Sequence, residues 1–282
     1  MKKNQVAQII VVLSLVLLTV GVYAGVPLNN LEGVGGIAFN PLAYLAGNKI
    51  DSDSKSGGDS LSLQNAFRKP QFGAWYVNLG DVDVDWTTFG VAETVFDRVE
   101  LSYGHEIIAP TGKNIYKNNF GAKVLAIQEN QGGLNFVPAI SVGIIAKTVS
   151  DTAPGVDDSG VDFYLVGTKL IKELPKPVLV SAGVLATKGL VTGVFGYDND
   201  RDYTVFGNLD VIPLSKLAVG VEYKQGAKFD DFKNANYWNA HVAWFATNNL
   251  SLIAAYVNAG DEKSTSKVGL GDGFVLSTQY AF

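Results

Sequence analysis

Residues 217–224 read Leu-Ala-Val-Gly-Val-Glu-Tyr-Lys, and this stretch decides the class of fold. Leucine, valine and tyrosine occupy the odd positions, whereas alanine, glycine, glutamate and lysine occupy the even ones. Successive side chains of a β-strand point to opposite faces of a sheet, so this segment has one apolar face and one small or polar face. The same period of two runs through residues 98–103, 178–187, 203–211 and 238–244. We therefore predict a protein built from amphipathic strands.

Twelve segments are candidate strands, and their number and spacing are typical of a barrel. They cover residues 37–46, 82–92, 98–105, 119–128, 136–147, 161–170, 178–188, 203–211, 217–226, 236–246, 250–258 and 273–282. Connections alternate in length: 93–97 and 247–249 are short, whereas 106–118 and 259–272 are longer. Bacterial outer-membrane barrels have an even number of strands, short periplasmic turns and longer outer loops. The predicted fold is an all-β, transmembrane antiparallel β-barrel of about 12 strands.

The start of the chain has the features of a secretory signal peptide. Lys2 and Lys3 precede a mainly apolar stretch over residues 6–20, and Ala24 ends a small-residue site before Gly25. A positive start, a short apolar core and a small-residue cleavage site are what export requires. We predict cleavage after Ala24, which makes residues 1–24 the leader and directs the remainder to the bacterial outer membrane.

The barrel domain is predicted over residues 25–282, and two parts of it are assigned no strand. Residues 25–36 are interpreted as a periplasmic lead-in to the first strand. Residues 47–81 are rich in serine, aspartate and glycine at first, and they are interpreted as one long outer loop whose second half extends the sheet. Two additional strands in this stretch, giving 14 in total, are the alternative.

The last predicted strand places four apolar side chains on one face, namely Phe274, Leu276, Tyr280 and Phe282. A terminal phenylalanine with an aromatic residue two positions earlier resembles the signal by which the barrel-assembly machinery recognises outer-membrane proteins. An amphipathic terminal strand can pair with an open sheet edge, which is how strand-addition receptors bind. The resemblance implies this machinery as a partner during biogenesis, and the apolar face implies contact with outer-membrane lipid and lipopolysaccharide.

Several segments also resemble an uncharacterised proteobacterial outer-membrane family of unknown function, whose members carry a signal peptide. The resemblance covers most of the chain after the leader. It rests on residues 31–43, 97–102, 162–170, 217–223 and 250–257. It implies an exported β-barrel, and it assigns no functional residue.

Nine polar side chains alternate onto the predicted inner face of the barrel. They are Arg98, Glu100, Lys123, Asp210, Glu222, Lys224, Asn239, His241 and Gln279. Mixed charge inside a barrel either lines a water-filled path or pairs across the lumen and closes it. A twelve-strand interior is wider than that of an eight-strand barrel, which side chains fill. We expect a porin-like passive channel for small solutes, and the alternative is a closed structural or interaction barrel that does not conduct.

A lipid hydrolase is the second alternative. The chain has two histidines, His105 and His241. Neither is followed two positions later by serine, which is the spacing that outer-membrane acyl hydrolases use. The pair His105 and Glu106 has the residue types of a base and its orienting group, but placing a polar ring at the barrel rim explains it equally well. We therefore predict no catalytic residues.

Metals, cofactors and nucleic acids are not expected. The chain has no cysteine, and its formal net charge of −5 disfavours binding to nucleic acid. Residues 198–202 place acidic groups as a calcium loop does, but Tyr203 and Leu209 stand where the pattern needs glycine and glutamate. A solvated turn or a weak surface cation site remains. Residues 33–38 match a bare G-x-G-x-x-A string without the strand-turn-helix context of a dinucleotide site.

Overall fold

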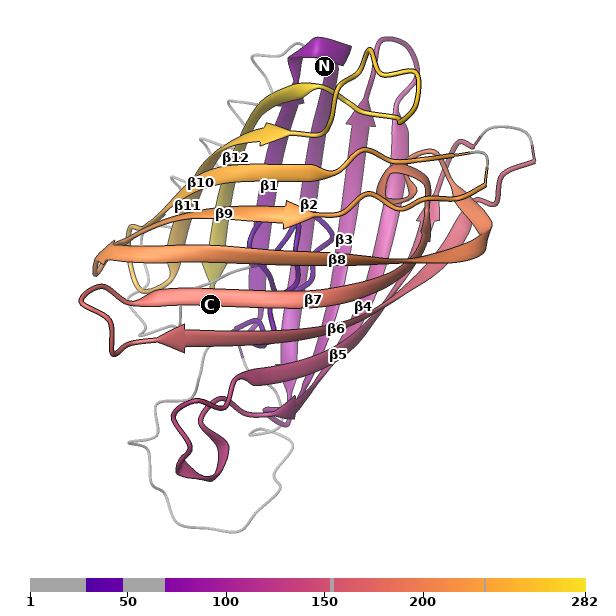
Figure 1. The fold of residues 1–282 in the computed structure, drawn as a ribbon. Helices are drawn as coiled ribbons and strands as arrows, with labels where there is room; N and C mark the ends of the chain where they lie inside the picture. Colours follow the sequence, from indigo (N-terminus) through magenta and orange to yellow (C-terminus); the bar gives the residue numbers. More distant parts are fainter. Residues whose placement is uncertain (1–28, 48–68, 153–154, 231) are drawn as a thin grey trace.

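The computed structural model describes residues 29–47, 69–152, 155–230 and 232–282, and its main feature is a closed sheet of twelve strands (Figure 1). The strands are β1 (Gln71–Leu79), β2 (Val84–Val95), β3 (Val99–Ala109), β4 (Ile115–Ile127), β5 (Ala139–Val149), β6 (Ser159–Ile171), β7 (Val178–Gly189), β8 (Tyr197–Leu214), β9 (Leu217–Lys224), β10 (Tyr237–Phe245), β11 (Leu250–Asn258) and β12 (Asp272–Ala281). Each strand is antiparallel to the next, and β1 pairs with β12 to close the barrel. The predicted all-β, twelve-strand barrel is confirmed.

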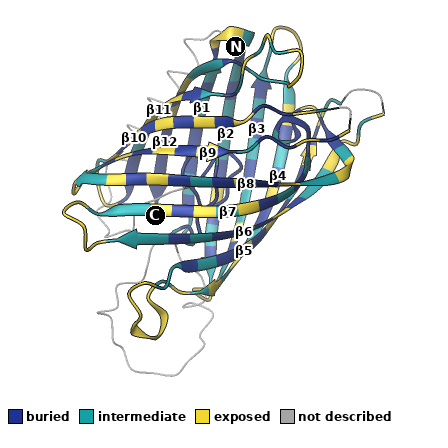
Figure 2. Cartoon of the chain, in the orientation of Figure 1, coloured by how far each residue is buried: buried dark blue, intermediate teal, exposed yellow. Residues whose placement is uncertain are grey.

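Exposed and buried residues alternate along the strands, as Figure 2 shows for β7 and β8. On β9, Val221 is 49% exposed, whereas its neighbour Glu222 is 1% exposed. Leu101 and Trp244 are likewise about half exposed on the outer surface. The barrel therefore carries apolar side chains on its outside, which is the pattern that lipid imposes. Its inside combines polar and charged side chains with an apolar cluster that includes Trp75, Val77 and Ile253.

Connections differ at the two ends of the barrel. Residues 96–98, 215–216 and 246–249 form tight turns at one end, which we call the turn end. Loops of greater length, including 225–236 and 259–271, connect strands at the other end, which we call the loop end. Three connections depart from this rule. At the loop end, the β1–β2 connection with the 3-10 helix η1 (Gly80–Val82) is short, and so is the β3–β4 connection, which was predicted as a longer loop over 106–118 and covers only residues 110–114. At the turn end, the β4–β5 connection with η2 (Gln131–Gly133) is long.

The first strand is not where the sequence pattern placed it. Residues 37–46, predicted as a strand, form none; they contain Pro41, which lacks an amide donor for a sheet ladder. The first strand is instead β1, which lies inside the range 47–81 predicted as an outer loop. Its inner face carries Trp75 as well as valine and leucine, so both faces are apolar and the period of two is blurred.

The C-terminal strand β12 pairs with β11 on one side and β1 on the other. Phe274, Leu276 and Phe282 are 44–48% exposed on the outer surface. Tyr280 is buried, and its ring centroid lies 5.1 Å from that of Phe282.

No helix in the described part of the chain is both long and apolar enough to cross a membrane.

Candidate functional site

Residues 29–47 lie inside the barrel, and we call this segment the plug (indigo in Figure 1). Its backbone amides donate hydrogen bonds to side chains on widely separated strands. Asn29 N donates to Gln279 Oε1 on β12 at 2.7 Å, and Ala43 N donates to Thr168 Oγ1 on β6 at 2.8 Å. Since these strands lie far apart around the barrel wall, the plug crosses the lumen.

This position corrects the predicted periplasmic lead-in, residues 25–36. Residues 29–36 pack within the barrel, and residues 25–28 lie outside the described part of the chain. The physical reason is that carboxylates and amides on the inner wall bind the peptide groups of this segment, which the strand pattern alone does not reveal.

Glu222 on β9 anchors the middle of the plug. Its carboxylate accepts hydrogen bonds from three successive backbone amides, those of Ala38 (3.1 Å), Phe39 (3.1 Å) and Asn40 (3.3 Å). Asn239 Nδ2 on β10 donates a fourth, at 2.6 Å. Consecutive N–H groups that converge on one anion form a nest, and hydrogen bonds to a charged acceptor are stronger than neutral ones. This buried carboxylate therefore fixes the chain where it turns toward Pro41.

Glu100 and Lys123 form a second anchor, nearer the turn end. Their charged groups lie 2.8 Å apart, and both side chains are buried. Glu100 accepts hydrogen bonds from the amides of Gly35 (2.8 Å) and Ala46 (2.6 Å). Lys123 Nζ donates to the carbonyl oxygens of Gly35 (3.1 Å) and Tyr44 (2.8 Å). A buried ion pair needs such further hydrogen bonds to offset the loss of hydration. Here the plug backbone supplies them, so pair and plug stabilise each other.

A third cluster lies on the loop-end side of the plug. Glu32 of the plug pairs with Lys147 and, at 3.4 Å, with Lys117. These lysines also pair with acids of the wall: Lys117 with Glu106 at 2.9 Å, and Lys147 with Asp162 at 2.6 Å. Burial by itself would raise the pKa of Glu32, but the nearby ammonium groups of Lys147 and Lys117 hold it well below its usual range. Glu32 is therefore a carboxylate ion.

A row of glycines makes room for the plug. Gly73, Gly90 and Gly104 are direct cross-strand partners on β1, β2 and β3. A Cβ at Gly104 would lie 2.6 Å from the carbonyl oxygen of Glu32, and one at Gly90 would lie 2.9 Å from Gly33 Cα. Gly33 itself has φ +83°, which disfavours other residues. Plug and wall are therefore matched in shape as well as charge.

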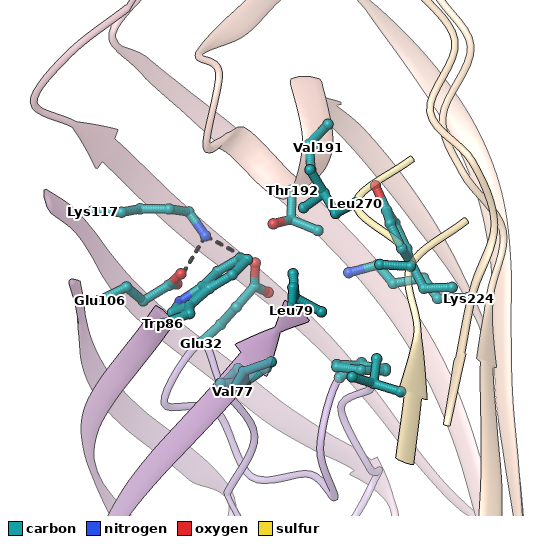
Figure 3. A pocket seen from close by; sticks show the side chains of 15 residues that line it. Glu32, Val77, Leu79, Trp86, Glu106, Lys117, Val191, Thr192, Lys224 and Leu270 are labelled. Carbon is teal, nitrogen blue, oxygen red and sulfur yellow. Dashed lines mark hydrogen bonds and ion pairs between the residues drawn. The ribbon is translucent and has the colours of Figure 1, made fainter. Parts of the chain in front are cut away.

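Two of the cavities among the described residues of the lumen lie on opposite sides of the plug. The larger, about 320 Å³, faces the turn end and is lined by Leu42 and Tyr44 of the plug together with wall residues such as His241. The smaller, about 60 Å³, lies on the loop-end side and is lined by Glu32 and Phe39 of the plug (Figure 3). Within the described chain, no residue lines both cavities. The described residues of the plug therefore lie between these two cavities.

The structure buries eight of the nine side chains expected on the inner face. They are Glu100, Lys123, Asp210, Glu222, Lys224, Asn239, His241 and Gln279. His241 Nε2 lies 2.7 Å from Asp210 Oδ1, and its Nδ1 lies 2.8 Å from Asn239 Oδ1. Arg98 is the exception: it is exposed in the turn between β2 and β3, where its guanidinium donates to the carbonyl of Leu125 at 3.3 Å.

Two other candidate groups do not form sites. His105 and Glu106 are neighbours on β3 and point to opposite faces, so they do not form a base with its orienting group. His105 instead contacts Asn118, 2.9 Å away, whereas Glu106 pairs inside the lumen. Residues 198–202 belong to β8 rather than to a loop, and no metal-binding cluster occurs among the described residues.

Sequence reasoning missed five charged residues of the lumen, namely Glu32, Glu106, Lys117, Lys147 and Asp162. Strand parity carried a signal for the four that lie on strands. Glu106 is six residues after Glu100 on β3, and Lys117 is six residues before Lys123 on β4, so each pair shares a face. Glu32 lies outside every strand, so no alternation of polar and apolar residues could indicate its position.

Comparisons with known proteins agree with this architecture. The sequence matches the family described as "Protein of unknown function (DUF3034)" over residues 25–277. The barrel is similar to the KdgM porin, with a TM-score of 0.54 and 13% identity, covering 75% of this chain and 99% of that chain. It is also similar to the NanC porin, with a TM-score of 0.50 and 8% identity, covering 76% and 99%. No curated protein matches the sequence significantly. Likeness at these identities establishes the fold.

Proposed function

The chain belongs to the DUF3034 family of unknown function, and we propose that it is a porin-like outer-membrane channel for small solutes whose lumen is closed by its own plug. The observation that carries this proposal is the independence of wall and plug. Each of the twelve strands pairs with two neighbours, and residues 29–47 contribute no strand to the sheet. The plug can therefore leave the lumen while the wall stays closed.

The contacts that hold the plug favour such movement. Its anchors, Glu222 and the pair Glu100 and Lys123, bind peptide groups that water can bind in their place. Exchange of a protein hydrogen bond for water changes the free energy by only about 0.5–1.5 kcal/mol, or about 1.5–3 kcal/mol where one group is charged. The free-energy difference between the plugged and open states is then the sum of several such terms. Binding of a solute or a membrane potential can change a difference of that size.

The runner-up is a closed barrel with a structural or interaction role. The position of the plug between the two cavities favours it, because residues such as Phe39 and Leu42 then stand in the way of a solute. The two functions differ in whether the unmodified protein ever opens.

The proposal includes the route to the membrane and the surroundings there. Similarity to the KdgM and NanC barrels supports an outer-membrane location. Cleavage after Ala24, recognition of Phe282 by the barrel-assembly machinery, and contact of the outer face with lipid and lipopolysaccharide complete the proposal.

Conductance across a planar lipid bilayer tests the proposal. The refolded full-length protein is compared with a variant that lacks residues 30–46, and heat-modifiable migration on gels verifies that both are folded. We expect long closed periods with brief openings for the unmodified protein, and a permanently open channel for the deletion variant. A folded deletion variant that carries no current contradicts the channel. An unmodified protein that never opens, beside an open deletion variant, favours the closed barrel.

A further inference from the structure

Three lysine side chains approach the loop-end side of the plug from different strands. Lys117 lies on β4, Lys147 on β5 and Lys224 on β9. The first two pair with wall acids and with Glu32. Lys224 is buried and points its ammonium group into the 60 Å³ cavity from the wall opposite Lys117 (Figure 3). Within the described residues, that ammonium group is attracted most strongly by the carboxylate of Glu32, which also attracts those of the other two lysines.

In the same cavity, two hydrogen-bond donors have no acceptor. The indole N–H of Trp86 and the hydroxyl of Tyr237 are buried and make no hydrogen bond within the described structure. A buried polar group normally has a partner, and the ammonium and indole groups can only donate. Together with Lys224, these groups form a set of donors that fits an anion.

One acceptor is also unused. Glu106 Oε1 accepts from Lys117 and from Asn119, but its second oxygen, Oε2, has no partner in the described structure. That oxygen can accept a hydrogen bond from a hydroxyl group. Apolar side chains, including Leu79 and Val257, line the rest of the cavity. The lining therefore suits a molecule with an anionic end and hydroxyl groups.

The charge of the site depends on the plug. Lys117, Lys147 and Lys224 supply three positive charges, and Glu106 and Asp162 supply two negative ones. Glu32 neutralises the remaining charge only while the plug is in place. When the plug leaves, this part of the wall has one net positive charge and a space that a carboxylate has just vacated.

Building on the proposed channel function, we propose that this half of the lumen binds small hydroxylated carboxylates, and that Glu32 occupies the carboxylate position when the channel is closed. The solute and Glu32 compete for the same lysines. A carboxylate solute thereby favours the open state in addition to passing through it. Carboxylate is favoured over other anions because the group that the structure seats between these lysines is a carboxylate.

Gluconate and sorbitol test the solute class, because they differ mainly in a carboxylate against a CH₂OH group. Each is added to the full-length protein in a planar bilayer, and block of the chloride current is measured within the open periods of single channels, so that a change in the frequency of opening does not enter the measurement. We expect block by gluconate, little by sorbitol, and weaker block by inorganic phosphate. Lys224→Met should raise the half-blocking gluconate concentration about tenfold. The matched control is Lys113→Gln, an exposed loop-end lysine whose loss should have less than a twofold effect.

Equal block by gluconate and sorbitol, stronger block by phosphate, or equal effects of the two lysine substitutions would overturn the proposal. A second measurement does not need conductance. Calorimetric titration of the Glu32→Ala variant with formate should show binding, and the unmodified protein should show none. A protein that never conducts but whose Glu32→Ala variant binds formate refutes the channel and supports the site. A conducting protein whose Glu32→Ala variant does not bind formate refutes the site alone.

Discussion

Replacing Glu222 with glutamine should release the plug without disturbing the barrel wall. The carboxylate accepts hydrogen bonds from three backbone amides of the plug. Each charged hydrogen bond that becomes neutral loses about 1 kcal/mol, so the plugged state loses about 3 kcal/mol relative to the open one. A change of that size shifts an equilibrium roughly 100-fold. The wall strand β9 keeps its backbone pairing with β8 and β10 because glutamine has nearly the same shape.

The assay is the open probability of single channels in a planar bilayer. We expect Glu222→Gln to raise it by up to about two orders of magnitude at unchanged single-channel conductance. Glu173→Gln is the matched control, because Glu173 is exposed in the turn after β6 and contacts no part of the plug. An open probability that is the same for Glu222→Gln and for the control would show that this carboxylate does not hold the plug.

Three further predictions concern the fit, the charge and the outer surface. Gly104→Ala places a methyl group 2.6 Å from the Glu32 carbonyl and should raise the open probability, whereas Gly167→Ala, whose nearest neighbour is 3.9 Å away, should not. The pKa of Glu32 is lowered in the plugged state, so its stabilising contribution is complete above its ordinary pKa of about 4.3 and declines below it. The open probability should therefore change little between pH 7 and pH 5 and should increase toward pH 3, where Glu32 becomes protonated. The increase should be smaller in Glu32→Gln. Val221→Arg puts a charge on the lipid-facing surface at a cost of up to about 2–4 kcal/mol; the yield of heat-modifiable barrel in vesicles should fall, and Val221→Leu should leave it unchanged.

The barrel was predictable from the sequence because lipid and lumen impose opposite demands on neighbouring side chains. In β9, valines and a tyrosine face outward while Glu222 and Lys224 face inward. The alternation of these residue types is visible in the sequence alone. β1 was not predicted as a strand because its inner face packs against the plug and is therefore apolar. On that face, Trp75 donates its indole hydrogen to the carbonyl of Asn29. A strand that is apolar on both faces has no period of two.

The plug was not predictable for a different reason. It is bound mainly through backbone amides and carbonyls, as at Ala38, Gly35 and Tyr44, and every residue type offers these groups. The alternation did identify the wall side of the contacts, since Glu100, Lys123 and Glu222 were all expected to face inward. The segment that these side chains bind could not be predicted, because residues 29–47 show neither the alternation of a strand nor the periodicity of a helix.

A reversible covalent lock tests most directly whether the plug closes the lumen. The chain has no cysteine, so Ala43→Cys and Ser141→Cys introduce a single pair where Ser141 Oγ lies 2.6 Å from the Ala43 carbonyl oxygen. The doubly substituted protein should carry no current when oxidised and should open again when a reducing agent is added, while each single variant behaves as the unmodified protein. An oxidised, fully cross-linked protein that conducts as well as the reduced form would show that the path for solutes does not depend on the plug.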